Sequence, residues 1–528
     1  MNAECQEAPL TRMPTREHSD TVAYVTFIAS ALGIGCFVRL LVVLQSNFPV
    51  GDGGLFFQMV GELQGNNLRE PLYTSYNHAH IPFAYPPLGL YVAAIVAKVT
   101  GTGLLPLFRF LPVTFACLSI IAFALLARAI LPMMAAASAT FIFALLPDSF
   151  DPEIKGGGIT RAPGQLAAIL AVWQLYLLCT KPTRKSLVLS ILLSTVAVVS
   201  HPEWGPFALL SGALMFALYG RARDALRRFA VVVVGVAVAS SPWWLVVISR
   251  YGLGALFAPL VGNAQVFPLQ NSVRTVLTLS LTHESWFPIG GVLALAGVLV
   301  SLRSRHYLLP AWLLLVLLTD SRGWQSPLVV PLSLLAGVGM AALLVWVGRS
   351  NAHASPRGAV VGLPAWSLAV LLTFLIARGI GSAVVYEGAN NTVVSGGERA
   401  AMAWIARNAP PHATFLVVGT GSGSSQEDVE WFPALTGRAS AETLQGLEWI
   451  PGLYANKSSQ IQTLQACLPD LACMRRELQA AKVRADYLYV AKSEPNTLCD
   501  GLCGELARTP RYGRVYSGPG AWIYRARR

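Results

Sequence analysis

Long apolar runs separated by short polar connections make up most of the first 380 residues. A helix of roughly 20 apolar residues is long enough to cross the hydrocarbon core of a bilayer. We interpret eleven runs as candidate transmembrane helices, at residues 22–44, 105–126, 131–146, 163–179, 187–199, 205–219, 229–248, 286–302, 308–319, 327–347 and 360–380. The pattern therefore predicts a polytopic α-helical membrane protein.

The apolar segment 86–99 differs from these runs. It is short for a membrane span, begins with Pro86-Pro87 and ends near Lys98. We expect it to form an interfacial helix. If it crossed the membrane, every later connection would change sides, and most basic clusters would lie outside, against the positive-inside rule.

Basic residues mark one set of alternate connections. With the N-terminus in the cytoplasm, the inner connections hold Arg128, Lys181, Arg184, Lys185, Arg221, Arg223, Arg227, Arg228, Arg303, Arg305, Arg349 and Arg357. Asp224 is the one acidic residue in the same connections. This distribution follows the positive-inside rule and predicts a cytoplasmic N-terminus.

The other set of connections is acidic and holds the polar clusters that could form a site. Its members are Asp52, Glu62, Glu70, Asp148, Asp151, Glu153, His201, Glu203, Trp204, His283, Glu284, Asp320 and Arg322. We therefore expect a site that faces the outer side of the membrane.

The composition supports an integral membrane protein and excludes an ordinary water-soluble one. Of the 528 residues, 54% are hydrophobic and only 12% are charged, and the mean hydropathy is +0.53. The net charge of +12 reflects membrane orientation and contact with anionic lipid. No basic stretch is interspersed with aromatic residues, which argues against a nucleic-acid partner.

A different pattern begins after residue 380, where the hydropathy falls. The local patterns predict a helix over 398–408 and strands over 414–418, 486–491 and 521–525. The remaining length, about 140 residues, is a usual domain size. We expect residues 1–380 to form the membrane domain and residues 381–528 to form an extracytoplasmic α/β domain.

Four of the eight cysteines lie in this domain as two close pairs, Cys467 with Cys473 and Cys499 with Cys503. An even number in an extracytoplasmic domain favours disulfide bonds, whose connectivity the sequence leaves open. A zinc site is the alternative, although these spacings match no standard zinc knuckle. The glycine- and serine-rich segment 419–425 lacks the lysine of a Walker loop, and we expect a flexible loop there.

Two short motifs in the first outer connection carry the candidate chemistry. Gly51-Asp52-Gly53-Gly54 follows the first apolar run, and Phe83-Ala84-Tyr85-Pro86-Pro87-Leu88-Gly89-Leu90-Tyr91 comes later in the same connection. A carboxylate at the end of a membrane span is energetically unfavourable if it faces lipid, but it can serve a function if it faces a polar cavity. The flanking glycines allow the backbone to approach a ligand closely. A plain turn is the alternative interpretation of the first motif.

Together with a second acidic outer connection and the C-terminal domain, these motifs resemble the GT-C membrane glycosyltransferases. Within that class the chain is most similar to the dolichyl-phosphate-mannose protein mannosyltransferase and aminoarabinose transferase group. The resemblance implies inverting transfer of a sugar from a polyprenyl-phosphate carrier to an acceptor at the outer face. It also implies that Asp52 is the general base and that the Pro-Pro element, Pro86 and Pro87 with the preceding Tyr85, lies at the substrate.

A second catalytic carboxylate is expected in the second outer connection. Asp148, Asp151 and Glu153 compete for this role, and the central position of Asp151 in its segment favours Asp151. Oligosaccharyltransferase-like members show an Asp-x-Asp or Asp-Glu pattern, whereas this chain has Asp-Pro-Glu. The use of a divalent metal ion therefore stays open, and no other cofactor is implied.

Cationic side chains are expected near the phosphate, because the carrier phosphate leaves as an anion. Lys155, Arg161 and Arg322 are the candidates. The alternative for Arg322 is an interfacial residue that extends its head group to water. His201 and Glu203 are candidate substrate or metal ligands, and a helix start is the alternative for their segment.

Two other classes of function compete with an enzyme. A transporter often has internal repeats and helices broken at the bilayer midplane, and no repeat relates the two halves of this sequence. A non-catalytic envelope assembly protein would use the C-terminal domain for recognition and would tolerate replacement of Asp52. The clustering of polar residues in the outer connections suits an active site at the membrane surface, and the resemblance implies a glycosyltransferase.

Overall fold

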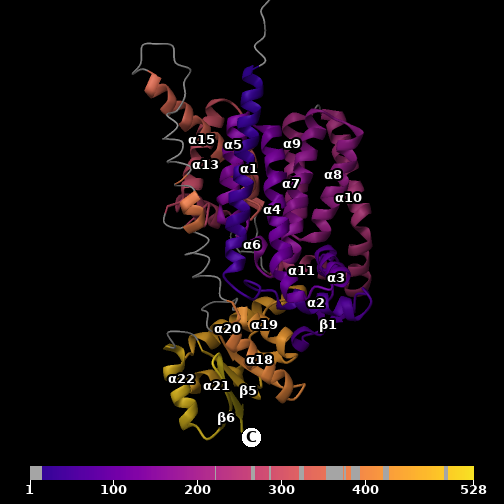
Figure 1. Cartoon of the computed structure of the whole chain (residues 1–528). Helices are drawn as coiled ribbons and strands as arrows, with labels where there is room; N and C mark the ends of the chain where they lie inside the picture. Colours follow the sequence, from indigo (N-terminus) through magenta and orange to yellow (C-terminus); the bar gives the residue numbers. More distant parts are fainter. Residues whose placement is uncertain are drawn as a thin grey trace, which may run out of the picture.

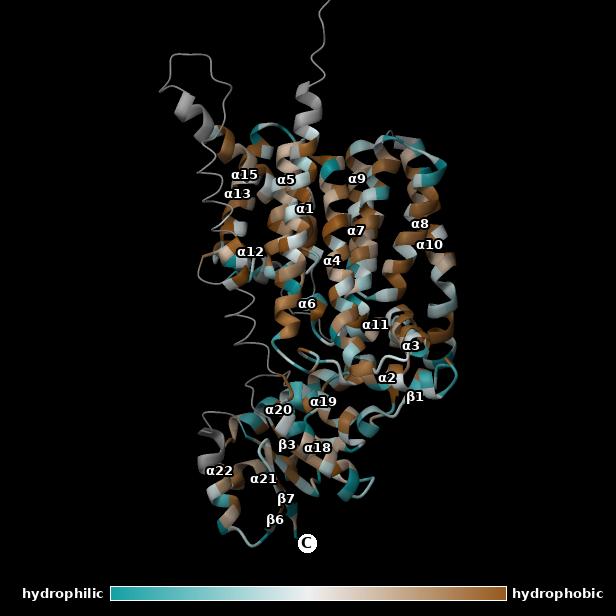
Figure 2. Cartoon of the chain, in the orientation of Figure 1, coloured by the Kyte–Doolittle hydropathy of each residue, from teal (hydrophilic) through white to brown (hydrophobic). Residues whose placement is uncertain are grey.

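The computed structural model describes residues 15–220, 222–262, 268–284, 287–319, 326–352, 373, 376–381, 393–419, 427–492 and 497–527. The described helices form an elongated bundle, and a smaller α/β domain covers one end of it (Figure 1). Hydrophobic residues dominate the bundle, whereas the smaller domain mixes hydrophobic and hydrophilic positions (Figure 2). The expected boundary near residue 380 stays a prediction, because residues 382–392 lie outside the described part of the chain.

The bundle contains ten described helices that coincide with predicted apolar runs. They are α1 (Thr15–Leu44), α4 (Leu104–Ile130), α5 (Met133–Leu145), α7 (Gly158–Thr180), α8 (Arg184–Ser200), α9 (Trp204–Tyr219), α10 (Ala222–Tyr251), α13 (Ile289–Arg303), α14 (Leu308–Thr319) and α15 (Val329–Ala352). The last predicted run, 360–380, lies largely outside the described residues.

Five of the described helices are long and apolar enough to cross a membrane, namely α1, α4, α7, α10 and α15. Several of the other predicted spans form shorter apolar helices, such as α5, α9 and α13. The described helices therefore support a membrane-spanning bundle, whereas the total of eleven crossings stays a prediction.

Small residues let bundle helices approach one another closely, as is typical of helix contacts in membranes. Gly297 of α13 and Gly339 of α15 face each other, and a Cβ at either position would overlap the backbone of the opposite helix. On the other side of α15, a Cβ at Gly337 would lie 2.5 Å from Ala139 Cβ of α5. Stacked Phe123 and Phe143, with ring centroids 4.2 Å apart, fill the contact between α4 and α5.

The first outer connection forms a compact layer at the end of the bundle that carries the α/β domain (Figure 1). It contains α2 (Gly54–Gly65), β1 (Tyr73–Thr74), η1 (Tyr76–His78), β2 (Ile81–Pro82) and α3 (Leu88–Thr100). The helix predicted at 86–99 is α3, which has 13 residues and ends at Gly101 with a left-handed φ of +68°. Its length and place support an interfacial helix.

Several short helices lie in the later connections. They are η2 (Pro147–Ser149), α6 (Asp151–Ile154), α11 (Leu253–Gly262) and α12 (Pro268–Leu277). The connections α4–α5, α7–α8 and α9–α10, which hold many of the basic residues, lie at the end of the bundle away from the α/β domain (Figure 1). The acidic connections lie at the opposite end, which supports the predicted charge asymmetry; which end faces the cytoplasm stays a prediction.

The C-terminal domain is built on a five-stranded sheet of order β4-β3-β5-β7-β6. Its strands are β3 (Thr414–Val418), β4 (Ala439–Ser440), β5 (Tyr487–Ala491), β6 (Tyr512–Ser517) and β7 (Ala521–Ala526). The neighbours β4, β3 and β5 are parallel, and β7 and β6 complete the sheet in antiparallel pairing. The three predicted strands are β3, β5 and β7.

Helices surround this sheet. They are α18 (Gly396–Asn408), α19 (Glu427–Thr436), α20 (Leu453–Ala466), α21 (Leu471–Ala480) and α22 (Thr497–Arg508), with η4 (Leu447–Trp449) before α20. The predicted helix 398–408 is α18, which begins with a capping box between Ser395 and Glu398. The segment 420–425 of the glycine-rich loop lies outside the described residues.

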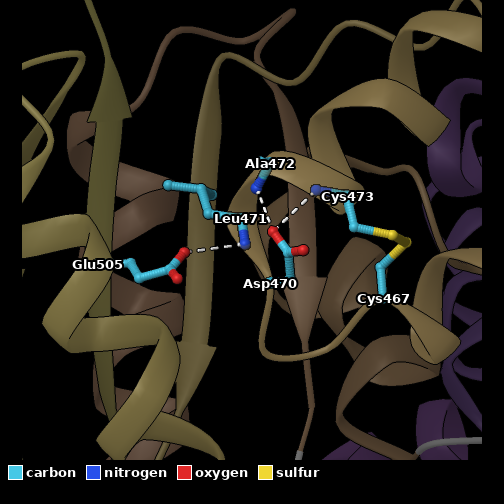
Figure 3. The surroundings of a disulfide bond; sticks show 6 residues. All are labelled: Cys467, Asp470, Leu471, Ala472, Cys473 and Glu505. Atoms are coloured by element: carbon cyan, nitrogen blue, oxygen red, sulfur yellow. Dashed lines mark hydrogen bonds between the residues drawn. A yellow bond between two sulfur atoms is a disulfide. The ribbon is translucent and has the colours of Figure 1, made fainter.

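The disulfide interpretation of the cysteines is confirmed. Cys467 and Cys473 are bonded to each other at the start of α21, and Cys503 is also disulfide-bonded. Next to the first bond, Asp470 Oδ1 accepts hydrogen bonds from the N–H groups of Ala472 at 2.8 Å and Cys473 at 3.0 Å (Figure 3). The disulfide therefore closes the loop that also caps α21.

One apolar core joins the C-terminal domain to the first outer connection. It runs from Phe48 and Leu55 through Trp431 and Phe432 of α19 to Tyr489 of the sheet, all of them buried. Burial of such large side chains is strongly favourable, so the two parts are held together as one body.

Candidate active site

Asp52 lies in a loop packed between the second outer connection and the C-terminal domain. Gly51 has a left-handed φ of +70°, which favours glycine. Gly156 N–H donates to Val50 O at 2.7 Å, and a Cβ at Gly156 would overlap the Asp52 carbonyl. On the other side, Trp431 Nε1 donates to Gly51 O at 2.9 Å. The glycines thus allow three segments of the chain to meet at Asp52.

The Asp52 carboxylate has a polar neighbour on each side. Its Oδ2 accepts a hydrogen bond from Gln445 Nε2 at 3.1 Å. A Cβ added at Gly157 would lie 3.8 Å from Asp52 Oδ1 and 4.0 Å from Arg161 Nη2. Arg161 lies in the first turn of α7, and its Nη1 donates to Pro152 O at 2.7 Å. A carboxylate and a guanidinium therefore flank the same point above Gly157.

Glu153 is the buried carboxylate beside this point. Its side chain is fully buried, its Oε1 accepts from Gln165 Nε2 at 3.3 Å, and its Oε2 has no hydrogen-bond partner among the described residues. Burial raises the pKa of Glu153 to about 8; Arg161 opposes this rise, and Glu203 adds to it. A carboxyl group with such a pKa can exchange a proton near neutral pH.

Asp151, the predicted second carboxylate, is oriented differently. Its Oδ2 forms an ion pair with Lys155 Nζ at 2.8 Å, and both side chains are partly exposed. Arg161 instead interacts electrostatically with the buried carboxyl groups, Glu153 first. Glu153 is therefore a second candidate for the role predicted for Asp151. Arg161 interacts electrostatically with Glu153 and Asp52, whereas the Lys155 side chain packs against Gly51 and pairs with Asp151.

Tyr85 forms an aromatic wall of the site. Its ring packs edge-on against Phe56 at 4.8 Å and against Trp449 at 5.4 Å between centroids. Its hydroxyl oxygen lies 3.4 Å from Thr160 Oγ1, which donates to it from α7. Pro86 is buried next to it and leads into α3. The predicted Tyr-Pro-Pro element thus contacts the second outer connection through α7.

His201 and Glu203 approach the same cluster from the connection between α8 and α9. The His201 ring is buried, lies 6.2 Å from the Tyr85 ring, and its Nδ1 accepts the Glu203 N–H at 3.3 Å. Glu203 occupies the N-cap position of α9, but its side chain makes no capping hydrogen bond. Its carboxylate interacts electrostatically with Arg161, and its role as a ligand stays a prediction.

Asp148 and His283 form a separate pair that joins two outer connections. The His283 N–H donates to Asp148 Oδ2 at 2.9 Å, and His283 Nδ1 is hydrogen-bonded to Asp148 Oδ1. This hydrogen bond raises the pKa of His283, against the effect of burial. Asp148 is thus occupied by a structural partner.

A groove of about 900 Å³ opens beside the first outer connection. Apolar residues of α3 and α10 line it, including Leu88, Trp243 and Val246, and Arg69 lies among the polar residues of its lining. Trp243 also donates its Nε1 hydrogen to Ala84 O at 3.1 Å, directly before Tyr85. The groove and the Asp52 cluster therefore share the segment around Tyr85.

The structure does not decide the roles predicted for Arg322 and for a metal ion. Arg322 lies outside the described residues. Among the described residues, no group of three or more histidine, cysteine, aspartate or glutamate side chains has an arrangement that could hold a metal ion. The question of metal use therefore stays open.

Comparison with known proteins places the fold. No family model matches the sequence, and no curated protein matches it. Among solved structures, the archaeal oligosaccharyltransferase AglB from Archaeoglobus fulgidus, in complex with an inhibitory peptide and a dolichol-phosphate, matches with a TM-score of 0.56 at 15% identity. The match covers 96% of this chain and 74% of AglB.

Two further structures match over almost the whole of this chain. ArnT from Cupriavidus metallidurans, bound to undecaprenyl phosphate, has a TM-score of 0.54 at 16% identity, and the match covers 96% of this chain and 98% of ArnT. The chain has the GT-C membrane fold. The mycobacterial arabinofuranosyltransferase AftD matches with a TM-score of 0.55 at 15% identity over 95% of this chain and 40% of AftD. The expected GT-C architecture is confirmed at the level of the fold.

Several residues of the candidate site are not evident from the sequence. Gln445, Glu430 and Trp431 come from the C-terminal domain, and no local motif marks them. Glu153 was one of three competing carboxyl groups. It is buried beside Arg161, whereas Asp148 is buried against His283 and Asp151 pairs with Lys155. The position of Glu430 and Trp431 after a glycine-rich segment is only a weak sequence signal for a site.

Proposed function

We propose that this protein is a glycosyltransferase that moves a sugar from a polyprenyl-phosphate donor to an acceptor at the outer face of the membrane. The observation that carries the proposal is the point above Gly157, flanked by Asp52 Oδ1 and Arg161 Nη2. A base and a cation on either side of one point suit a displacement in which a hydroxyl or amine attacks a sugar phosphate.

Asp52 would accept the proton of the acceptor as the acceptor attacks the anomeric carbon. The bond between that carbon and the phosphate oxygen breaks at the same time, and the phosphate leaves with its electron pair. Arg161 would stabilise this developing negative charge, because a fixed guanidinium is effective in a site with little water. Attack from the face opposite the phosphate inverts the anomeric configuration.

Glu153 and Asp151 are the candidates for the second carboxylate. Glu153 suits a proton-exchanging group because its pKa of about 8 leaves both forms populated near neutral pH. Asp151 with Lys155 would instead act on a more exposed part of the substrate. His201, Glu203 and Tyr85, with Pro86 behind it, would form the wall against which the sugar or acceptor lies.

The groove beside α3 and α10 supports a lipid-linked donor. Its apolar lining suits a prenyl chain. Arg69 and Arg250 also line it, and they suit a phosphate near the membrane surface, although Arg250 is paired with Glu70 at 3.9 Å. Two of the structures with this fold are described as complexes with dolichol-phosphate and undecaprenyl phosphate, which fits the same donor class.

The test is carrier release by purified protein in lipid with a panel of polyprenyl-phosphate sugars. Asp52→Asn and Arg161→Gln should each reduce turnover by about a hundredfold or more, a usual loss for a missing base or charge partner. Asp224→Asn, in the first turn of α10 at the other end of the bundle, is the matched control and should leave turnover unchanged. Full turnover by Asp52→Asn would remove Asp52 as the base, and no release from any donor by wild type would overturn the proposed reaction.

A further inference from the structure

Gln445 makes two hydrogen bonds across the interface with the first outer connection. Its Oε1 accepts the Leu55 N–H at 2.9 Å, and its Nε2 donates to Asp52 Oδ2 at 3.1 Å. The two ends of an amide differ, since the oxygen only accepts and the nitrogen only donates. The bond to Leu55 therefore fixes the NH₂ end of Gln445 toward the Asp52 carboxylate.

The same side chain caps α2. The first N–H groups of a helix have no partner within the helix, and Gly53, at the N-cap of α2, has no side chain to provide one. Gln445 Oε1 provides that partner from the C-terminal domain. One side chain thus holds both the start of α2 and the carboxylate two residues before that start.

Buried Glu430 fixes the turn that carries Gln445. Its Oε1 accepts the Leu444 N–H at 3.0 Å, and its Oε2 accepts the Gln445 N–H at 3.1 Å. The next residue, Gly446, has a left-handed φ of +92°, and a Cβ there would lie 2.7 Å from Ile81 Cδ1. The backbone at Gln445 is therefore fixed on two sides, by the Glu430 side chain of α19 and by Ile81 of the first outer connection.

The position of Gln445 also follows from the sheet. β3 and β4 are parallel, and the chain leaves β4 at Ser440 shortly before it reaches Gln445. Open α/β sheets bind ligands beyond the carboxyl ends of their parallel strands. In this protein, the segment that leaves the carboxyl end of β4 contacts Asp52.

We infer that Gln445 is a positioning residue through which the C-terminal domain holds Asp52 in the orientation needed to accept a proton. This inference rests on the proposed role of Asp52 as the base. Gln445 contacts the base and not the reacting atoms, so it acts on the chemical step and leaves donor binding largely unchanged. The C-terminal domain thereby contributes to catalysis as well as to the stability of the fold.

Two variants of Gln445 separate its contacts. Gln445→Glu keeps an acceptor for the Leu55 N–H and replaces the donor to Asp52 with a carboxylate oxygen. Gln445→Met has a similar length and loses both hydrogen bonds. Gln462→Glu, on the exposed face of α20, is the matched control. The readouts are kcat and donor KM with the polyprenyl-phosphate sugar that the panel identifies, and hydrogen exchange of the first amides of α2.

The expected result is a fall in kcat of about tenfold or more in both variants, with donor KM near the wild-type value. Exchange at the start of α2 should accelerate in Gln445→Met and much less in Gln445→Glu. Wild-type kcat in both variants, with Asp52→Asn inactive, would overturn the inference and leave the proposed base in place. If no donor turns over, the proposed reaction fails, and unchanged exchange in Gln445→Met would then overturn the positioning contact itself.

Discussion

Trp431 Nε1 donates a hydrogen bond to Gly51 O at 2.9 Å, across 380 positions of sequence. The indole is fully buried and packs edge-on against Phe48 at 4.7 Å between ring centroids. Its Cζ2 also lies against Gly53, where a Cβ would be 2.8 Å away. The glycines around Asp52 are therefore required by the C-terminal domain as well as by the second outer connection.

Replacing Trp431 should destabilise the loop that carries Asp52. Trp431→Phe removes the N–H donor and should cost about 1 kcal/mol of unfolding free energy. Trp431→Ala also opens a cavity and should cost about 3–5 kcal/mol. Thermal unfolding in detergent measures both, with Trp404→Phe at a partly exposed position of α18 as the control. A melting temperature for Trp431→Ala equal to that of wild type would contradict a shared core.

Glu153→Gln should change the pH dependence of stability. Burial raises the folded-state pKa of Glu153 to about 8, above the ordinary value of 4.5. The contribution of protonated Glu153 to the free energy of unfolding is fully present below the unfolded pKa, and it is lost as the pH rises through about 8. The total loss is about 1.4 kcal/mol for each pH unit between the two pKa values. A glutamine stays neutral, so the variant should melt above wild type at about pH 9 and close to it at about pH 4.

The same variant should lose activity while it gains stability, because a buried ionisable group in a site is retained for its chemistry. Asp224→Asn, which removes an exposed carboxylate, should leave the difference between the two pH values unchanged. A Glu153→Gln protein that melts below wild type at about pH 9 would show that the carboxyl group is not destabilised by burial.

The Asp148–His283 pair should stabilise the protein mainly at acidic pH. The hydrogen bond to Asp148 raises the pKa of His283 above its ordinary value of 6.5. The contribution is therefore fully present below that value and is lost as the pH rises through the raised pKa. His283→Gln should lower the melting temperature more at about pH 5.5 than at about pH 9, whereas the exposed His306→Gln should lower it equally little at both. An equal loss for His283→Gln at both pH values would exclude an ion pair.

Hydropathy and local patterns were sufficient to predict the helical bundle and three of the five sheet strands, but not β4 and β6. Apolar runs report on the surrounding lipid, and β3, β5 and β7 are short β-branched and aromatic segments of the kind that favours strands. The helix α3 was also predicted, from its proline pair and its length, and its interfacial position stays a prediction. Such features depend on neighbours in the sequence, so they are legible without a structure.

The composition of the site depends on contacts between distant segments. Gln445 lies 393 positions from Asp52, and no periodicity relates the two. The choice between Asp151 and Glu153 depends on which side of the short helix α6 faces Arg161, and a helix of four residues has no hydrophobic pattern that would show this. Glycine spacing indicated close backbone approach near Asp52, but not that α19 makes that approach.

Gly156 and Gly157 offer a direct test of the point between Asp52 and Arg161. A Cβ at Gly156 would overlap the Asp52 carbonyl, so Gly156→Ala should force the backbone apart and cost about 2 kcal/mol or more. Gly157 has ordinary helical dihedrals, φ −65° and ψ −13°, and its nearest neighbour, Phe56 Cε2, would lie 3.4 Å from the new methyl group. The fold should therefore accept Gly157→Ala.

The methyl group of Gly157→Ala would nevertheless occupy the point that Asp52 Oδ1 and Arg161 Nη2 flank, at 3.8 Å and 4.0 Å. If the sugar phosphate and the attacking group meet there, turnover should fall by about tenfold or more while the melting temperature stays near that of wild type. Gly156→Ala should instead lower the melting temperature. Carrier release and thermal unfolding on the same preparations separate the two effects, and wild-type turnover by Gly157→Ala would move the reacting atoms away from this point.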